Sequence, residues 1–295
     1  MKRLTLLLAG VVFCMAASAQ SDTTVQAKRS DTMRIGNIII IKRGKRSSSD
    51  SGSAVNITMG RNYNNRKKSR VTTNWGIVDI GFANYTDKTN YGNTGGYLNN
   101  NPLSPAFSKN DFKVKTGKSI NVNIWFFMQR LSLVKQNVNL KYGLGLELNN
   151  YRYKTSSAIS YREGGIRPYP DGQPTNAPFI FRDSINFSKN KLAADYLTVP
   201  VMLNFATNKN HNGKGLSISF GVSAGYLYSQ RNKQKSEEFG KKKNKGDYNL
   251  ERFKFSYIGE LGLGPVKLYA SYAPKSMYEN GLDMRPFNFG FRLSN

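Results

Sequence analysis

The sequence predicts an all-β protein: a transmembrane, antiparallel, up-and-down β-barrel of about eight strands, preceded by a flexible N-terminal segment. Three observations favour this fold. Large apolar residues alternate with small polar ones in about eight segments from residue 74 onward, long connections between these segments alternate with shorter ones, and the chain begins with an export-signal pattern.

The composition excludes two other classes of protein. The mean hydropathy is −0.53, and no stretch beyond the N-terminus reaches the roughly 18 to 20 apolar residues of a spanning helix. A polytopic helical membrane protein is therefore excluded. With 17 Tyr, 17 Phe and 2 Trp among 295 residues, the chain has too many aromatic side chains to remain unfolded throughout.

Residues 1–19 are predicted to be a signal peptide. Lys2 and Arg3 form a positive start, an apolar run spans 4–16, and the small residues 17–19 fit a cleavage site. The run is too short for a membrane anchor, which is the alternative interpretation. The single cysteine, Cys14, follows the large residue Phe13, so lipidation is not expected; the mature chain would then have no disulfide and no cysteine ligand.

Residues 20–73 are predicted to form a basic, Ser/Gly-rich periplasmic segment. Basic clusters at 42–46 and 66–70 flank a Ser/Gly stretch, which is typical of a flexible linker. The isoleucine run at 38–41 is too short to span a bilayer, and we expect it to form a short paired strand.

Residues 74–295 carry the strand pattern, in which every second side chain points to the same face of a sheet. Residues 138–149 show it most fully, with six apolar positions opposite six polar or glycine positions. The successive apolar faces are Val78, Ile80 and Phe82; Ile120, Val122, Ile124, Phe126 and Met128; Val138, Leu140, Tyr142, Leu144, Leu146 and Leu148; Leu197, Val199, Val201, Leu203 and Phe205; Leu216, Ile218, Phe220, Val222, Ala224, Tyr226 and Tyr228; Phe253, Phe255, Tyr257, Leu261 and Leu263; Val266, Leu268, Ala270 and Tyr272; and Phe287, Phe289, Phe291 and Leu293.

The polar face decides between a soluble sandwich and a membrane barrel. It consists mostly of Ser, Asn and Gly, whereas a solvated outer face is normally rich in Lys, Glu and Thr. Small polar side chains fit the narrow interior of an eight-stranded barrel, and the apolar face fits lipid. The connections agree, because long ones at 86–117, 154–191 and 229–252 are separated by short ones at 130–137, 206–214 and 264–265. An even number of strands places both termini on the periplasmic side.

The segments 75–85, 196–203 and 287–293, together with the signal-peptide pattern, resemble the PorT-like outer-membrane β-barrels of Bacteroidota. The resemblance covers residues 74–295 and implies an outer-membrane location and a link to protein secretion or envelope assembly. One departure is that Phe291 is followed by four further residues, whereas such barrels often end on an aromatic residue.

No enzyme, metal or cofactor is expected. The one histidine, His211, lies in a predicted turn, where a solvated role is the simplest interpretation. The carboxylates of the loops lack paired spacing on a strand, and the Gly-rich pieces lack the strand-to-helix context of a phosphate loop. Inside the predicted barrel, a few charges are expected to form an ion-pair network that keeps it closed: Lys141, Glu147, Lys254, Glu260, Lys267 and Arg292.

The excess of basic residues is the remaining functional signal. Seven of them gather in the third long connection, where we expect either a solvated loop or a contact with lipopolysaccharide phosphates or another anionic surface ligand: Arg231, Lys233, Lys235, Lys241, Lys242, Lys243 and Lys245. Export makes nucleic acid an improbable partner. The predicted function is a structural or interaction barrel, whose partners are outer-membrane lipid, lipopolysaccharide and envelope or secretion proteins. The alternative is a small anion-preferring pore or a surface ligand receptor.

Overall fold

The computed structural model describes residues 69–134, 137–154, 158–169, 172–207, 215–263 and 266–293, together with three short strands before them. The chain divides into two units, Met1–Lys67 and Lys68–Asn295. In the first unit, β1 (Thr32–Ile35), β2 (Ile38–Ile41) and β3 (Asn56–Thr58) form an antiparallel sheet. The isoleucine run is therefore a paired strand, as expected. The predicted signal peptide, the basic cluster at 42–46 and His211 lie outside the described residues.

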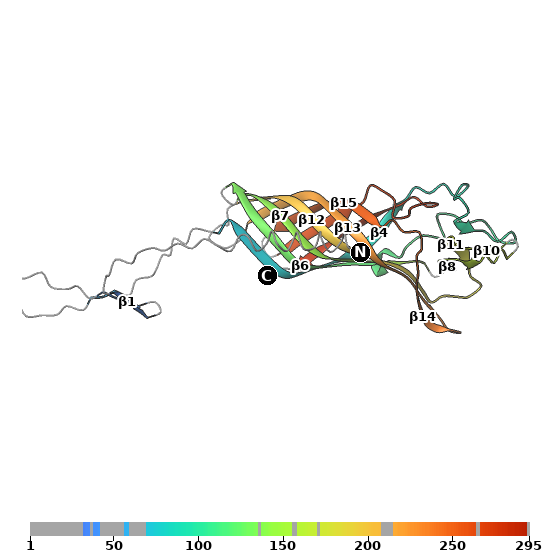
Figure 1. Cartoon of the computed structure of the whole chain (residues 1–295), viewed down its shortest axis with the longest axis horizontal. Coiled ribbons are helices and arrows are strands. Elements are labelled where there is room, and N and C mark those ends of the chain that lie inside the picture. The colour runs from blue at the N-terminus through green and yellow to red at the C-terminus, as the bar shows by residue number, and fades with distance from the viewer. Residues whose placement is uncertain are drawn as a thin grey trace, which may run out of the picture. The chain divides into compact units, whose positions relative to one another are not determined.

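The second unit is built on one antiparallel sheet that closes into a ring of eight strands (Figure 1). Strands that follow one another along the chain are neighbours in the ring, and the last strand pairs with the first, which confirms an up-and-down barrel. Among the described residues, no helix is long and apolar enough to cross a membrane. The ring consists of β4 (Val71–Asp87), β6 (Ile120–Val134), β7 (Val138–Arg152), β12 (Lys189–Ala206), β13 (Leu216–Ser236), β15 (Phe253–Leu263), β16 (Val266–Tyr272) and β17 (Met284–Leu293), and β14 (Gly240–Lys245) extends it from β13.

The two faces of the barrel differ as the alternation predicts. On β17, Phe291 is 56% exposed, whereas the next residue, Arg292, is 6% exposed and points into the lumen. Aromatic side chains gather at both ends of the outer apolar band, with Trp75 against Phe127 at one end and Tyr226 against Phe253 at the other. Such aromatic girdles mark the two interfaces of membrane barrels.

The structure corrects the predicted position of Met128. The alternation places this residue on the outer face, but a β-bulge between Trp125 and Phe127 shifts the register of β6 against β7. Met128 therefore points inward and is buried against Trp125 and Met202. On the neighbouring strand β4, Gly76 has a positive φ of 64°, and the side chains of β4 also switch from one face of the sheet to the other at this residue.

The long connections all leave the same end of the barrel, and their described residues pack together as a loop cap. We define the loop cap as residues 88–119, 153–154, 158–169, 172–188, 237–252 and 273–283. Within it, β5 (Leu98–Asn99), β11 (Phe179–Arg182) and β8 (Ile159–Arg162) form a small sheet, β9 (Gly165–Ile166) pairs with β10 (Pro174–Thr175), and Thr116–Lys118 forms the 3-10 helix η1. Figure 1 shows β8, β10 and β11 gathered beyond the barrel strands. The short turns and the first residues of β4 lie at the opposite end.

The loop cap has an apolar core of its own that continues into the barrel mouth. Inward side chains of the barrel, such as Tyr151 and Leu192, join cap residues such as Tyr161 and Ile180 in a single buried cluster. The hydroxyl of Tyr161 is 2.9 Å from that of Tyr278 and also bonds that of Tyr153. Burial of these side chains therefore holds the described connections together at the mouth of the barrel.

Candidate anion-binding face

Two barrel strands continue well beyond the outer apolar band. On β12 the outward apolar residues run from Phe205 to Leu197, a length of roughly 25 Å along the strand at about 3.3 Å per residue. Past Leu197, the outward positions become Asp195, Ala193, Lys191 and Lys189. The same outer surface therefore changes from lipid-facing to basic within a few residues.

A second β-bulge turns the basic residues of β13 to this surface. Tyr196 of β12 pairs with Leu227 and Asp195 pairs with Ser229, so Tyr228 is the extra residue. Before the bulge, even-numbered residues of β13 such as Tyr226 face outward; after it, odd-numbered residues do. Without the bulge, the basic side chains would point into the loop cap.

The pairing register then aligns like charges directly across four strands. Lys191 lies opposite Arg152 of β7 on one side and Lys233 of β13 on the other, and Lys233 lies opposite Lys243 of β14. A second row consists of Lys189, Lys235 and Lys241, and a third of Arg231 and Lys245. We define the basic face by these nine residues: Arg152, Lys189, Lys191, Arg231, Lys233, Lys235, Lys241, Lys243 and Lys245.

The charges of the basic face are poorly compensated within the protein. Among the described residues, its one ion pair joins Arg231 to Asp195. Partial burial lowers the pKa of Lys191, and the nearby cations Lys189, Arg152 and Lys233 lower it further. The pKa of Lys233 is lowered for the same two reasons. Directly opposed like charges destabilise a sheet, and binding of an external anion would relieve this repulsion.

The structure places the predicted site residues in three different situations. Lys233, Lys235, Lys241, Lys243 and Lys245 share the basic face and form no ion pair with described residues. Arg231 shares this face but is held by Asp195. Lys242 belongs to the opposite face of the β13–β14 hairpin, where its ammonium lies 4.0 Å from the centre of the Phe239 ring.

Sequence reasoning missed three members of the basic face: Arg152, Lys189 and Lys191. The spacing of Lys189 and Lys191 on alternate residues matches that of Lys233 and Lys235, and this was the available signal. This matching spacing indicates a shared surface only once the register that pairs β12 with β13 is known.

A groove of about 530 Å³ lies at the junction of β12, β13 and β14. It is lined by Arg152, Ser188, Lys189, Lys233, Gln234, Lys235, Lys241, Lys242 and Lys243.

Five of the charges expected in the barrel lumen form ion pairs there: Lys141, Glu147, Lys254, Glu260 and Arg292. Arg292 forms a bidentate contact with Asp79, with distances of 2.6 and 2.8 Å, and a further ion pair with Glu260. Lys141 also pairs with Glu260, and elsewhere in the lumen Lys254 pairs with Glu147. Asp79 was not among the predicted charges, although it occupies an inward position of β4.

The lumen beside this network is nearly filled. The Trp125 indole donates to Asp79 at 2.7 Å, and the Tyr269 hydroxyl donates to Asn121 at 2.5 Å. A cavity of only about 30 Å³ remains next to these residues, which is about the share of liquid volume of one water molecule. In the part of the chain that the structure describes, no group of three or more His, Cys, Asp or Glu could hold a metal ion.

Comparison with known proteins identifies the family. Two crystal structures of Ail, the attachment invasion locus protein of Yersinia pestis, are similar to the chain. The first has 10% identity and a TM-score of 0.28 over 75% of this chain and 98% of that one; the second, in complex with the heparin analogue sucrose octasulfate, has 14% identity and a TM-score of 0.26 over 74% and 99%. No curated protein sequence matches the chain. Residues 51–282 match the family described as outer membrane protein beta-barrel domain. Because this match covers most of the chain, the protein belongs to that family and is a β-barrel of the outer membrane.

Proposed function

We propose that the protein is a non-conducting, interaction-type barrel whose basic face binds the phosphate groups of outer-leaflet lipopolysaccharide. The observation that carries the proposal is the set of opposed cations that continues the lipid-facing surface upward, such as Lys191 opposite Lys233. In this proposal the loop cap faces the cell exterior and both termini face the periplasm.

The height of the basic face above the apolar band supports this ligand. Lys191 lies six residues beyond Leu197 on β12, which is roughly 15 Å along the membrane normal for a strand tilted by about 40°. The Arg231–Asp195 pair lies closer to the band. Lipopolysaccharide carries phosphates at the hydrocarbon boundary and in the core sugars above it, so successive rows of cations meet successive anionic groups.

The resemblance to PorT-like barrels of Bacteroidota supports a role in protein secretion or envelope assembly. In this role the loop cap, or the N-terminal segment, would contact other envelope proteins. No catalytic, metal or cofactor-dependent step is part of the proposal, and nucleic acid is not a proposed partner. Cross-linking in intact cells, followed by purification of the protein, would identify those partners.

The alternative of a small anion-preferring pore is less well supported. Arg292 bridges two carboxylates across the lumen, and the apolar core of the loop cap fills the barrel mouth. An open pore would need a continuous aqueous path through both. We therefore expect purified protein in planar bilayers to show no conductance above background, and stable channel openings would favour the pore.

Binding of lipopolysaccharide tests the proposed ligand directly. The variant Lys191→Gln/Lys233→Gln/Lys243→Gln removes three of the four cations in the first row of the basic face and leaves Arg152. The matched control Lys88→Gln/Lys109→Gln/Lys113→Gln removes the same charge from exposed cap positions. We expect at least tenfold weaker binding to lipopolysaccharide-containing liposomes for the first variant, with a smaller salt dependence, and little change for the control. Equal binding by the two variants would refute the proposal.

A further inference from the structure

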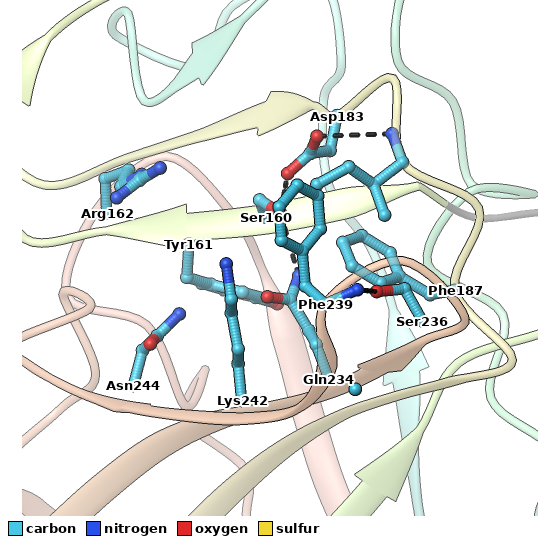
Figure 2. Close-up of a pocket in the computed structure, with 12 residues that line it drawn as sticks. Ser160, Tyr161, Arg162, Asp183, Phe187, Gln234, Ser236, Phe239, Lys242 and Asn244 are labelled. Atoms are coloured by element: carbon cyan, nitrogen blue, oxygen red, sulfur yellow. Dashed lines mark hydrogen bonds between the residues drawn. The ribbon is translucent and has the colours of Figure 1, made fainter.

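A separate pocket lies in the loop cap, on the face of the β13–β14 hairpin opposite the basic face. It has a volume of about 150 Å³ and is formed by β8, the segment after β11, and the inner side of the hairpin. Figure 2 shows Arg162, Lys242 and Asn244 on one side of this pocket, and Asp183, Ser160 and Phe187 on the other.

One side of the pocket carries two positively charged side chains and one side-chain amide. Among the described residues, Arg162 and Lys242 form no ion pair; the Arg162 guanidinium lies over the Phe181 ring, and the Lys242 ammonium lies over the Phe239 ring. The pocket also lies beside the Asn244 amide. Two cations and an amide that converge on one space are suited to a carboxylate.

The other side of the pocket presents a fixed polar network. Asp183 accepts a hydrogen bond of 2.9 Å from the Ser160 hydroxyl and one of 3.3 Å from the backbone N–H of Ile185. Gln234 donates to the same hydroxyl at 2.8 Å. Ser160 and Gln234 are buried, so this network has a defined orientation. The Asp183 carboxylate keeps lone pairs that can accept from a ligand hydroxyl.

Aromatic side chains complete the walls. Phe187 is buried at the pocket, whereas Phe239 is 45% exposed at its rim, in the turn that joins β13 to β14. The backbone N–H of Phe239 donates to the Ser236 hydroxyl at 3.0 Å, which holds this turn in place. Apolar walls beside a carboxylate site and hydroxyl acceptors match a molecule with a C–H surface, several hydroxyls and one negative charge.

From this arrangement we infer that the pocket binds a carboxylated sugar, such as a uronic acid at the end of a surface glycan. The carboxylate meets Arg162, Lys242 and Asn244; ring hydroxyls meet Asp183; and the sugar ring packs against Phe239. The volume fits a single ring rather than a longer chain. The pocket borders the groove at the basic face, because Gln234 and Lys242 line both, but it does not include Lys243 or the other members of the basic face.

Calorimetric titration of the full-length protein in detergent micelles with methyl glucuronide tests the inference. Methyl glucoside, which lacks the carboxylate, and acetate, which lacks the hydroxyls, are the reference ligands. The variants are Arg162→Gln and Lys242→Gln, and the matched control is Lys243→Gln, the adjacent residue with the same charge. Both variants alter exposed side chains, and resistance of the folded barrel to detergent before heating verifies that each variant folds.

We expect saturable binding of methyl glucuronide, weakened roughly tenfold or more by Arg162→Gln and by Lys242→Gln and unchanged by Lys243→Gln. Methyl glucoside and acetate should bind much more weakly than the uronide. The inference is overturned by absence of saturable binding, by equal affinity for the neutral glycoside, or by equal loss in the Lys243→Gln control. A loss of lipopolysaccharide binding in Lys243→Gln alone would leave the pocket assignment intact, so the two proposals fail separately.

Discussion

Lys191 of β12 and Lys233 of β13 lie directly opposite each other on the outer surface of the barrel. Partial burial and neighbouring cations lower the pKa of both ammonium groups. A like-charge pair in this position opposes folding, so its effect on stability should depend on whether an anion is bound. This relationship leads to the first of four predictions.

Replacing Lys233 by Gln should stabilise the protein when no polyanion is present. Removing one member of the opposed pair should raise the free energy of unfolding by up to about 1 kcal/mol. Urea unfolding followed by tryptophan fluorescence measures this difference. Added lipopolysaccharide should reverse the order, because it binds the wild-type protein more tightly. A variant that is less stable than the wild type without lipopolysaccharide would contradict this account of the basic face.

Replacing Arg292 by Met should strongly destabilise the barrel. The change leaves Asp79 without its bidentate partner and removes one of two cations beside Glu260, all buried in the lumen. Removing one partner of a buried ion pair lowers the free energy of unfolding by about 3–5 kcal/mol. Urea unfolding in lipid vesicles measures the loss, and Arg285→Met, which breaks the more exposed pair with Asp283, serves as the control. Equal stability of the two variants would show that the lumen network contributes little.

Adding a methyl group at Gly145 should disturb the wall of the lumen. A Cβ there would lie 2.6 Å from the carbonyl oxygen of Ile124 and 2.7 Å from the Trp125 ring. Overpacking of this kind costs about 1–3 kcal/mol, so Gly145→Ala should unfold at lower urea concentration. Gly117→Ala, where a Cβ meets nothing within 4 Å, should behave as the wild type. A neutral result at Gly145 would mean that β6 and β7 can separate there without cost.

Strong alkali should destabilise the protein through its buried tyrosines. Burial raises the pKa of Tyr153, in the loop cap, to about 12, whereas the pKa of an unfolded tyrosine is about 10. The folded state therefore keeps the proton over a range in which the unfolded chain loses it. This contribution to stability is fully present below about pH 10 and is lost as the pH rises to about 12.

Unfolding measured across that pH range should show a steep fall in stability. In Tyr153→Phe the fall should be shallower, because one ionising group has been removed from the unfolded state. The remaining decrease comes from other buried cap tyrosines with raised pKa, such as Tyr161 and Tyr278. A pH dependence unchanged by the substitution would indicate that Tyr153 is already solvated in the folded protein.

The alternation of residues was sufficient to predict the barrel, its eight strands and the orientation of most side chains. Side chains on a strand alternate between the two faces of the sheet. Because the outer face contacts lipid and the inner face lines the lumen, a run such as Leu144, Gly145, Leu146 and Glu147 can be oriented from its sequence. The lumen ion-pair network followed from the same argument, because few inward positions carry a charge. Met128 was misplaced because a single bulged residue reverses the period, and nothing in the local sequence marks the bulge.

Tertiary structure alone decided the two candidate sites. Long connections have no fixed period, so their packing into a loop cap depends on contacts between residues far apart in the chain, such as Tyr161 and Tyr278. Six of the seven predicted basic residues share a surface with three others that were not predicted, because of the register that pairs β12 with β13 and because of the bulge at Tyr228. The seventh predicted residue, Lys242, points to the other side of the hairpin. Composition determined that the protein would attract anions; strand register, which is set by pairing between distant segments, determined where the cations meet.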